Sequence, residues 1–288
     1  MGFFSVLNNT SSLIALQEST ASGVGLQNTL AKLSSGKRLF RSAEDPAGLA
    51  IADGLRGQIR TLQQAVRNAN DAQGFLQTGD SALSSVQNIL TRAASLAAQA
   101  ASDTNSGQYD AIENELEQLF SEIDRIGGGT EFNGIQIFVD TTREIFVGDT
   151  QNATGNNATI SFSTSGLSVS GLGFTGTGAQ VSVATGGAVT VSIGSGGDAQ
   201  ALLEDIESAI DLVAEKRGNF GSQLNRLDNA LSVISSQIQN LTAAESQIRD
   251  ANLAEEITNL TKFQILTQSG IASLAQANQS QQSVLSLF

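Results

Sequence analysis

Residues 203–248 carry an apolar side chain at almost every third or fourth position. Of the fourteen positions reached by these alternating steps, twelve are apolar and two are charged. They are Leu203, Ile206, Ile210, Val213, Arg217, Phe220, Leu224, Leu227, Leu231, Ile234, Ile238, Leu241, Glu245 and Ile248. A mean step of about 3.5 residues is typical of a coiled-coil seam, and a helix of this length measures roughly 70 Å. Since such a rod is too long for a compact domain to surround, we expect an equally long partner helix.

Residues 46–101 are the predicted partner. Apolar residues recur there every seven positions, at Leu55, Leu62, Ala69, Leu76, Leu83, Leu90 and Ala97. A second apolar column is interrupted by Gln73 and Asp80, which predicts that the helix changes its contact part-way along. Asp45 suits the N-cap of this helix, and Pro46 suits its first position.

A third helix is expected at residues 109–126. Its apolar side chains again follow steps of three and four, at Tyr109, Ile112, Leu116, Leu119, Ile123 and Ile126. The glycines from Gly127 to Gly129 are expected to end it, and Asp198 is expected to cap the 203–248 helix. The predicted fold class is therefore mainly α, a long antiparallel coiled-coil-like helical bundle in which the N- and C-terminal halves of the chain pair.

A small element rich in β-hairpins is expected at residues 130–197. Residues 132–138 and 144–148 are predicted as short strands, with a turn at Asn133-Gly134. Residues 160–162, 181–183 and 189–193 alternate as strands do, and the last two would be joined through Thr185-Gly-Gly. Residues 150–197 contain no charged side chain and sixteen Ser or Thr.

The two ends of the chain are alike in kind. Glu18 is the only charged side chain before Lys32, and no charged side chain follows Lys262. Both ends are apolar and rich in Gln, Asn and Ser, and no other part of the chain offers them an obvious apolar surface. We therefore expect them to associate with further copies of the chain. The residues expected to carry this polymerisation are Phe3, Phe4, Leu7, Leu13, Leu274, Val284, Leu285, Leu287 and Phe288.

This organisation predicts two domains. Residues 1–44 and 252–288 would form a terminal helical domain, and residues 45–251 would form a rod that includes the β element. The tails show helical spacing of apolar residues, although Gly23 and Gly25 weaken an isolated helix.

The composition excludes several function classes. The chain has no Cys and no His, which removes disulfides, thiolate metal sites and the commonest general base. A net charge of −13 argues against nonspecific nucleic-acid binding, and no apolar run reaches the ~20 residues of a membrane span. We therefore predict no enzyme activity, no cofactor, no nucleic-acid partner and no membrane insertion.

Two weaker signals have simpler explanations. The segment from Gly171 to Gly176 matches a dinucleotide-binding fingerprint by letter, but it opens no predicted helix and no acidic residue follows before Asp198. The carboxylate pairs Glu44/Asp45 and Glu255/Glu256 are better explained as helix caps and solvated helix faces than as a general acid and base.

Several longer motifs carry a family resemblance. Near the N-terminus they are Leu33-Ser-Ser-Gly-Lys-Arg, Asp45-Pro-Ala-Gly-Leu-Ala-Ile-Ala and Arg67-Asn-Ala-Asn-Asp. In the middle they are Glu122-Ile-Asp-Arg-Ile and Glu131-Phe-Asn-Gly. Near the C-terminus they are Gln223-Leu-Asn-Arg-Leu, Glu245-Ser-Gln-Ile-Arg-Asp-Ala and Ala277-Asn-Gln-Ser-Gln-Gln-Ser-Val-Leu-Ser-Leu. With these motifs in this order, the chain resembles a bacterial flagellin over about residues 1–147 and 198–288.

The resemblance implies a structural subunit that polymerises into the flagellar filament for swimming motility. The termini would form the inner tube of the filament and the rod helices a second shell, with residues 150–197 in place of large outer domains. The first residues lack a basic region and a cleavage site of a signal peptide, so export to the extracellular flagellum would occur without cleavage. The implied partners are other copies of the chain, an export chaperone and the filament cap.

The resemblance also bears on two surface features. Some flagellins are detected by a Toll-like innate receptor, and Arg92, Leu96 and Glu115 match the contacting positions, whereas Thr91, Ala94 and Ser95 differ from the family's residues. Arg92 and Glu115 are equally well explained as solvated residues between helices. The hydroxyls of residues 150–197 either carry O-linked sugars or complete hydrogen bonds within strands and turns.

Two alternatives to a filament subunit remain. A hook–filament junction protein shares the terminal patterns of flagellin, and its copy number per cell would be about a dozen rather than thousands. An enzyme displayed on the filament is a third possibility, but a zinc protease of the His-Glu-x-x-His type cannot exist in a chain without His.

Overall fold

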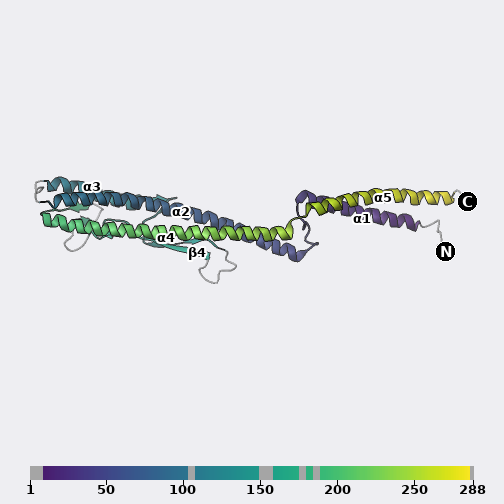
Figure 1. The fold of residues 1–288 in the computed structure, drawn as a ribbon, viewed down its shortest axis with the longest axis horizontal. Coiled ribbons are helices and arrows are strands. Elements are labelled where there is room, and N and C mark those ends of the chain that lie inside the picture. Colours follow the sequence, from purple (N-terminus) through teal and green to yellow (C-terminus); the bar gives the residue numbers. More distant parts are fainter. Residues whose placement is uncertain (1–8, 103–107, 149–157, 175–179, 184–188, 286–288) are drawn as a thin grey trace. The chain divides into compact units, whose positions relative to one another are not determined.

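The computed structural model describes residues 9–102, 108–148, 158–174, 180–183 and 189–285. Within these ranges the chain is mainly helical, with five α-helices and three two-stranded antiparallel sheets. It divides into two compact units. We call residues 1–59 with 239–288 the terminal unit, and residues 60–238 the central unit. Figure 1 shows the helices that build them. The predicted fold class is confirmed.

Helix α2 (Pro46–Ala100) begins as the sequence predicts. The Gly48 backbone N–H donates a hydrogen bond to Asp45 Oδ1 at 3.0 Å, so Asp45 caps the helix whose first residue is Pro46. The sevenfold apolar column is buried at all six of its positions from Leu62 to Ala97. Leu55, which lies in the terminal unit, is only half-buried.

Helix α4 (Gly196–Arg249) is the rod expected at residues 203–248. One column of its seam is fully buried in the central unit, at Ile206, Val213, Phe220, Leu227 and Ile234. The other column, from Ile210 to Ile238, is half-buried. The helix begins at Gly196, earlier than predicted, so the residue that precedes it is Ser195 and not Asp198. Ser195 Oγ donates to Asp198 Oδ2 at 2.9 Å, and Asp198 lies in the first turn.

The charged interruptions of the two seams pair with each other inside the central unit. Arg217 Nε donates to Asp80 Oδ1 at 2.9 Å, and its Nη1 donates to Gln87 Oε1 at 2.7 Å. Gln73 donates in the same way to Asp228. The polar positions of α2 and α4 therefore fix the register of the two helices, and they need no second subunit as a partner.

Helix α3 (Tyr109–Gly129) buries Ile112, Leu116, Phe120 and Ile123. It does not stop before its glycines, as predicted, but continues through them to Gly129. Gly127 is required because a Cβ there would lie 1.8 Å from the carbonyl oxygen of Leu167. The glycine therefore permits a close approach of the following segment to α3.

The β element contains three hairpin-like pairs. Strands β1 (Glu131–Phe132) and β2 (Ile135–Gln136) are joined at Asn133 and Gly134, whose φ angles of 52° and 73° are those of the predicted tight turn. Strand β3 (Thr141–Phe146) pairs with β4 (Thr159–Thr164). Strand β5 (Val181–Val183) pairs with β6 (Val189–Val191), and Thr185-Gly-Gly lies outside the described residues.

Acidic residues of α3 attach this largely uncharged element. Glu113 accepts the backbone N–H of Ile193, and Glu117 accepts that of Val191 at 3.1 Å. Asp124 accepts the N–H of Val169 at 2.7 Å. The charge-free segment therefore obtains acceptors for its backbone from the helix that it covers.

Aromatic residues fill the contact between the β element and α2. Phe75 lies 6.2 Å from Phe132 and 5.7 Å from Phe162, measured between ring centroids. Arg143 lies over the Phe75 ring at 5.5 Å. The contact between α2 and the β element begins at Asn68, whose Nδ2 donates to the carbonyl of Phe146 at 3.2 Å.

Candidate assembly surface

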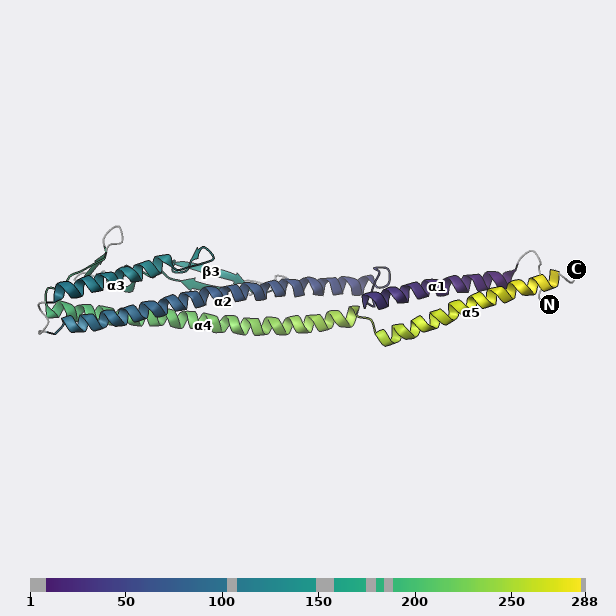
Figure 2. The same ribbon diagram turned by 90° about the horizontal axis from the view of Figure 1, so that it is seen from above.

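Helices α1 (Thr10–Ser35) and α5 (Leu253–Leu285) lie side by side in the terminal unit (Figure 2). They run antiparallel, because contacts made early in α1 meet residues late in α5. Asn9 Nδ2 donates to the carbonyl of Ala277 at 3.3 Å. A Cβ added at Gly25 would meet the ring of Phe263, and one added at Gly270 would meet Ser19.

The seam between α1 and α5 consists mostly of small and polar residues. On α1 the buried and half-buried positions at heptad spacing are Ser12, Ala15, Ser19, Ser22, Leu26, Thr29 and Leu33. On α5 they are Glu256, Leu260, Phe263, Thr267, Gly270, Leu274 and Ala277. The only buried residues described in α1 are Ser22 and Thr29. Small residues let the two helices approach closely but bury little apolar area.

Most of the large apolar residues of the pair point away from this seam. Ten of them on α1 and α5 are exposed: Leu13, Ile14, Leu16, Val24, Leu30, Leu253, Ile257, Ile265, Leu266 and Ile271. In the central unit, only Ile135, Leu212 and Val233 are exposed in this way among the described residues. A concentration of exposed apolar side chains is typical of a protein–protein interaction surface.

The linkers next to the helix pair are held by backbone and ionic contacts. Residues 36–38 meet residues 249–251, because Ala251 N–H donates to Gly36 O at 3.0 Å and Arg38 N–H to Arg249 O at 2.7 Å. Glu245, the second charged interruption of the α4 seam, accepts from Arg56 at 2.8 Å. These contacts explain Glu245 within one chain and fix the end of α1 beside the end of α4.

The residues expected to carry polymerisation fall into three groups. Leu13 is 68% exposed on α1, whereas Leu274 is half-buried in the α1–α5 seam. Val284 and Leu285 belong to the last turn of α5. Phe3, Phe4, Leu7, Leu287 and Phe288 lie outside the described residues. Ser22 and Thr29 are buried as well, but an apolar heptad pattern does not include them because neither side chain is apolar.

The positions that match a receptor surface differ in exposure. Arg92 of α2 donates to Glu115 of α3 through Nε at 3.0 Å and Nη2 at 2.7 Å, and both side chains are exposed. Leu96 is only 4% exposed and belongs to the core. The structure therefore brings Arg92 and Glu115 together as an inter-helix ion pair and places Leu96 beneath the surface.

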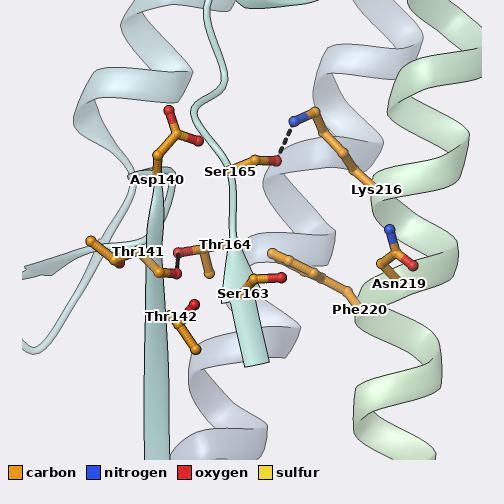
Figure 3. Close-up of a pocket in the computed structure, with 9 residues that line it drawn as sticks. All are labelled: Asp140, Thr141, Thr142, Ser163, Thr164, Ser165, Lys216, Asn219 and Phe220. Carbon is orange, nitrogen blue, oxygen red and sulfur yellow. Dashed lines mark hydrogen bonds between the residues drawn. The ribbon is translucent and has the colours of Figure 1, made fainter. Parts of the chain in front are cut away.

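An open depression of about 360 Å³ lies between the β element and α4 in the central unit (Figure 3). Lys216 reaches across it to Ser165 and donates to the Gly166 carbonyl at 3.3 Å, while Asp140 accepts the Gly166 N–H at 2.9 Å. Burial lowers the pKa of the Lys216 amino group, and Asp140 and Glu215 act in the opposite direction. Lys216 and Asp140 therefore bind groups of the chain itself, and the Lys216 contacts attach the loop after β4 to α4.

The weaker sequence signals have structural roles. Glu44 pairs with Lys32 at 3.6 Å and accepts the Phe40 N–H, and Asp45 caps α2. Residues 170–172 form a short 3-10 helix that ends at Gly173 with a φ of 94°, while Gly176 lies outside the described residues. Among the residues that the structure describes, no helix has the length and hydropathy to cross a membrane.

Two family models match most of the chain. Residues 6–143 match the bacterial flagellin N-terminal helical region, and residues 203–288 match the bacterial flagellin C-terminal helical region. The chain is 35% identical to flagellin of Bacillus subtilis over 98% of both chains. It is 34% identical to flagellin FlaB2 of Treponema pallidum, again over 98% of both.

A solved structure shares the fold at lower identity. It is a Vibrio parahaemolyticus protein assigned as flagellar hook-associated, with a TM-score of 0.57 and 13% identity, covering 72% of this chain and 100% of that one. At this identity the likeness concerns the fold alone. The matches to flagellin extend along nearly the whole chain at 34–35% identity. The chain therefore belongs to the bacterial flagellin family, whose members are structural proteins of the flagellar filament.

Proposed function

We propose that this flagellin polymerises through the outward apolar faces of α1 and α5. In this proposal, residues 1–44 and 252–288 form the inner tube of the filament, and residues 45–251 form the rod outside it. The observation that carries the proposal is the arrangement of α1 and α5: mostly small or polar residues lie between the two helices, and ten large apolar residues lie outside. Burial of these outer faces between copies stabilises the polymer by removing apolar area from water.

The polymerisation residues keep their proposed roles under this arrangement. Leu13 presents an exposed apolar side chain to a neighbouring copy. Leu274 acts differently, because its place in the α1–α5 seam supports the helix pair. Phe3, Phe4, Leu7, Val284, Leu285, Leu287 and Phe288 extend the assembly surface toward the ends of the chain.

Deletion of Ser280–Phe288 tests the proposal. The central unit buries its core without these residues, so the variant retains its helical circular-dichroism signal. It is expected to form no filaments under conditions in which the complete chain does, as judged by negative-stain electron microscopy. Filaments of normal length from the truncated chain would contradict the proposal.

A function in the hook–filament junction is less well supported. The likeness to a hook-associated protein at 13% identity concerns the fold alone and does not favour this role. The function that we propose is mechanical and requires no catalytic group, in agreement with a family of structural proteins. Thousands of copies per cell in extracellular filaments support the filament subunit, and about a dozen copies would support the junction protein.

The exposed apolar face of α5 is also the proposed binding site of an export chaperone. Before assembly, the apolar residues of α5 are exposed to water, and an export chaperone that covers them would prevent premature association. We also propose that the filament cap guides the incoming subunit and that export leaves the N-terminus uncut. Intact-mass measurement of extracellular filaments tests the last point, since a cleaved leader would give a shorter chain.

A Toll-like innate receptor is a second candidate partner, at the surface formed by α2 and α3. The exposed ion pair of Arg92 and Glu115 supports it, whereas Leu96 would contribute only by supporting the helix surface. Arg92→Ala is expected to reduce receptor signalling by purified monomer without loss of helical signal. Equal signalling by the variant would leave Arg92 and Glu115 as an inter-helix ion pair alone.

A further inference from the structure

Helix α5 carries an open groove on its outward face. It is lined by Ile257, Thr258, Thr261, Lys262, Ile265 and Leu266 and has a volume of about 560 Å³. None of these residues belongs to the seam with α1. Lys262 is the only charged side chain of residues 257–288. The groove is therefore an apolar surface with a single positive charge in it.

Helix α1 carries a negative charge on its apolar outer face. Glu18 is the only charged side chain of residues 1–31. It is exposed, and its neighbours one turn before and one turn after, Ile14 and Ala21, are exposed as well. Within the described part of the chain, neither Glu18 nor Lys262 forms a hydrogen bond or an ion pair. Residues 10–31 of α1 and residues 257–285 of α5 therefore each carry one charged side chain, which has no partner in the described part of the chain and lies among exposed apolar residues.

The two charges do not meet within one chain. Since Gly25 faces Phe263 and Ser19 faces Gly270, Lys262 lies level with the residue that follows Gly25. Glu18 is about eight residues further along α1, which corresponds to roughly 12 Å of helix. Two copies offset by about this distance along the helix axis would bring Glu18 of one copy level with Lys262 of the other.

We propose that the α5 groove of one subunit binds the α1 face of a second subunit, with Lys262 of the first paired to Glu18 of the second. The inference rests on the proposed polymerisation through α1 and α5. If the outer faces are buried in the polymer, both charges are withdrawn from water, and an unpaired charge in an apolar interface is strongly disfavoured. Pairing satisfies both charges, and because residues 10–31 and residues 257–285 have only one charge each, it also fixes the register of the two copies along these stretches.

Charge exchange in the complete chain tests this contact. The variants are Glu18→Lys, Lys262→Glu and the double variant that carries both. Purified protein is assembled on filament seeds without other proteins, and the critical concentration is measured by sedimentation. Each single variant is expected to raise the critical concentration at least tenfold, because it places like charges together. The double variant is expected to return within about threefold of the unmodified chain, because the pair is restored in reverse.

Glu255→Lys is the matched control, since it makes the same change in net charge as Glu18→Lys at an exposed position outside the groove. It is expected to assemble like the unmodified chain. Circular dichroism of each monomer confirms that the helical content is unchanged.

The outcomes separate the contact from the filament function. Normal assembly of both single variants, or no recovery in the double variant, overturns the contact while the unmodified chain still forms filaments. A defect that appears only in secretion by living cells also overturns it and assigns the groove to an export chaperone. Failure of the unmodified chain to assemble on seeds counts against the proposed function, and the contact falls with it.

Discussion

The central and terminal units share heptad spacing, but the residues in their helix seams differ in size and polarity. Along α2 and α4 of the central unit, the seam is mostly Leu, Ile, Val and Phe with some Ala, and its few polar positions pair across it. Between α1 and α5 of the terminal unit, the seam is Ser, Thr, Gly and Ala with a few larger residues, and most exposed apolar side chains lie outside it. Of the 41 apolar residues buried among those described, three belong to the terminal unit.

This difference separates folding from assembly within one chain. The central unit obtains its stability from burial within the monomer, so it does not depend on neighbours. The terminal unit leaves its apolar area exposed, so its stability increases when that area is covered. Substitutions in the two units are therefore expected to affect different measurements.

The largest expected effect is on the core of the central unit. Phe120 is fully buried, and its ring centroid lies 4.9 Å from that of Phe174. Phe120→Ala is expected to lower the free energy of unfolding by about 3–5 kcal/mol, because it removes buried apolar area and leaves a cavity. Urea unfolding followed by circular dichroism measures the change. The matched variant Leu13→Ala should leave monomer stability nearly unchanged and slow assembly instead, and a similar stability loss in both would remove the distinction between the units.

A second effect concerns the close approach at the end of α3. Gly127→Ala is expected to cost about 1–3 kcal/mol, because the new Cβ overlaps the Leu167 carbonyl and forces the backbone to move. Gly128→Ala is the control, since nothing lies within 4 Å of its Cβ position. In thermal unfolding, Gly128→Ala should be neutral or slightly stabilising, because alanine favours the helix. Equal stability of the two variants would contradict the packing of residues 158–174 on α3.

The sequence predicted the elements of the central unit better than their contacts. The columns on α2 and α4 are visible because burial there selects large apolar residues at fixed steps. Phe120 and the carboxylates Glu113 and Glu117 could not be assigned, because their roles depend on where the uncharged segment lies against α3. The closer contact at Leu167 likewise gives Gly127 a role that a helix-ending glycine does not have.

For the terminal unit, the sequence predicted the exposed surface but not the contact between its helices. Its exposed apolar face could be inferred from the absence of any other surface to cover it. The α1–α5 seam could not, since Ser22 and Thr29 look like solvent-exposed residues until the partner helix is known. The seam becomes visible as a heptad pattern when Ser, Thr and Gly are counted with the apolar residues.

The third prediction concerns the seam of the terminal unit. Gly25→Ala is expected to loosen the α1–α5 pair by about 1 kcal/mol, because its Cβ displaces the Phe263 ring and offsets the better helix propensity of alanine. Gly23→Ala, with nothing within 4 Å, should strengthen α1 by a similar amount. Amide hydrogen exchange in α1 measures both, and faster exchange is expected only for Gly25→Ala. Slower exchange in both variants would show that the α1–α5 contact at Phe263 is absent.

The smallest expected effect is a pH dependence confined to the central unit. Burial, with a smaller effect of Glu204, raises the pKa of the Asp205 carboxyl above its usual value. The folded protein therefore binds this proton more tightly than the unfolded chain, so the carboxylate reduces stability at neutral pH, and the loss is relieved as the pH falls through the folded pKa. Asp205→Asn is expected to raise the thermal midpoint slightly at pH 7 and to lose this advantage below the unfolded pKa. At either pH, Asp205→Asn should leave the protection of α1 amides from hydrogen exchange unchanged, because Asp205 belongs to the central unit. An equal advantage of Asp205→Asn at pH 7 and at pH 3 would assign the gain to packing rather than to charge.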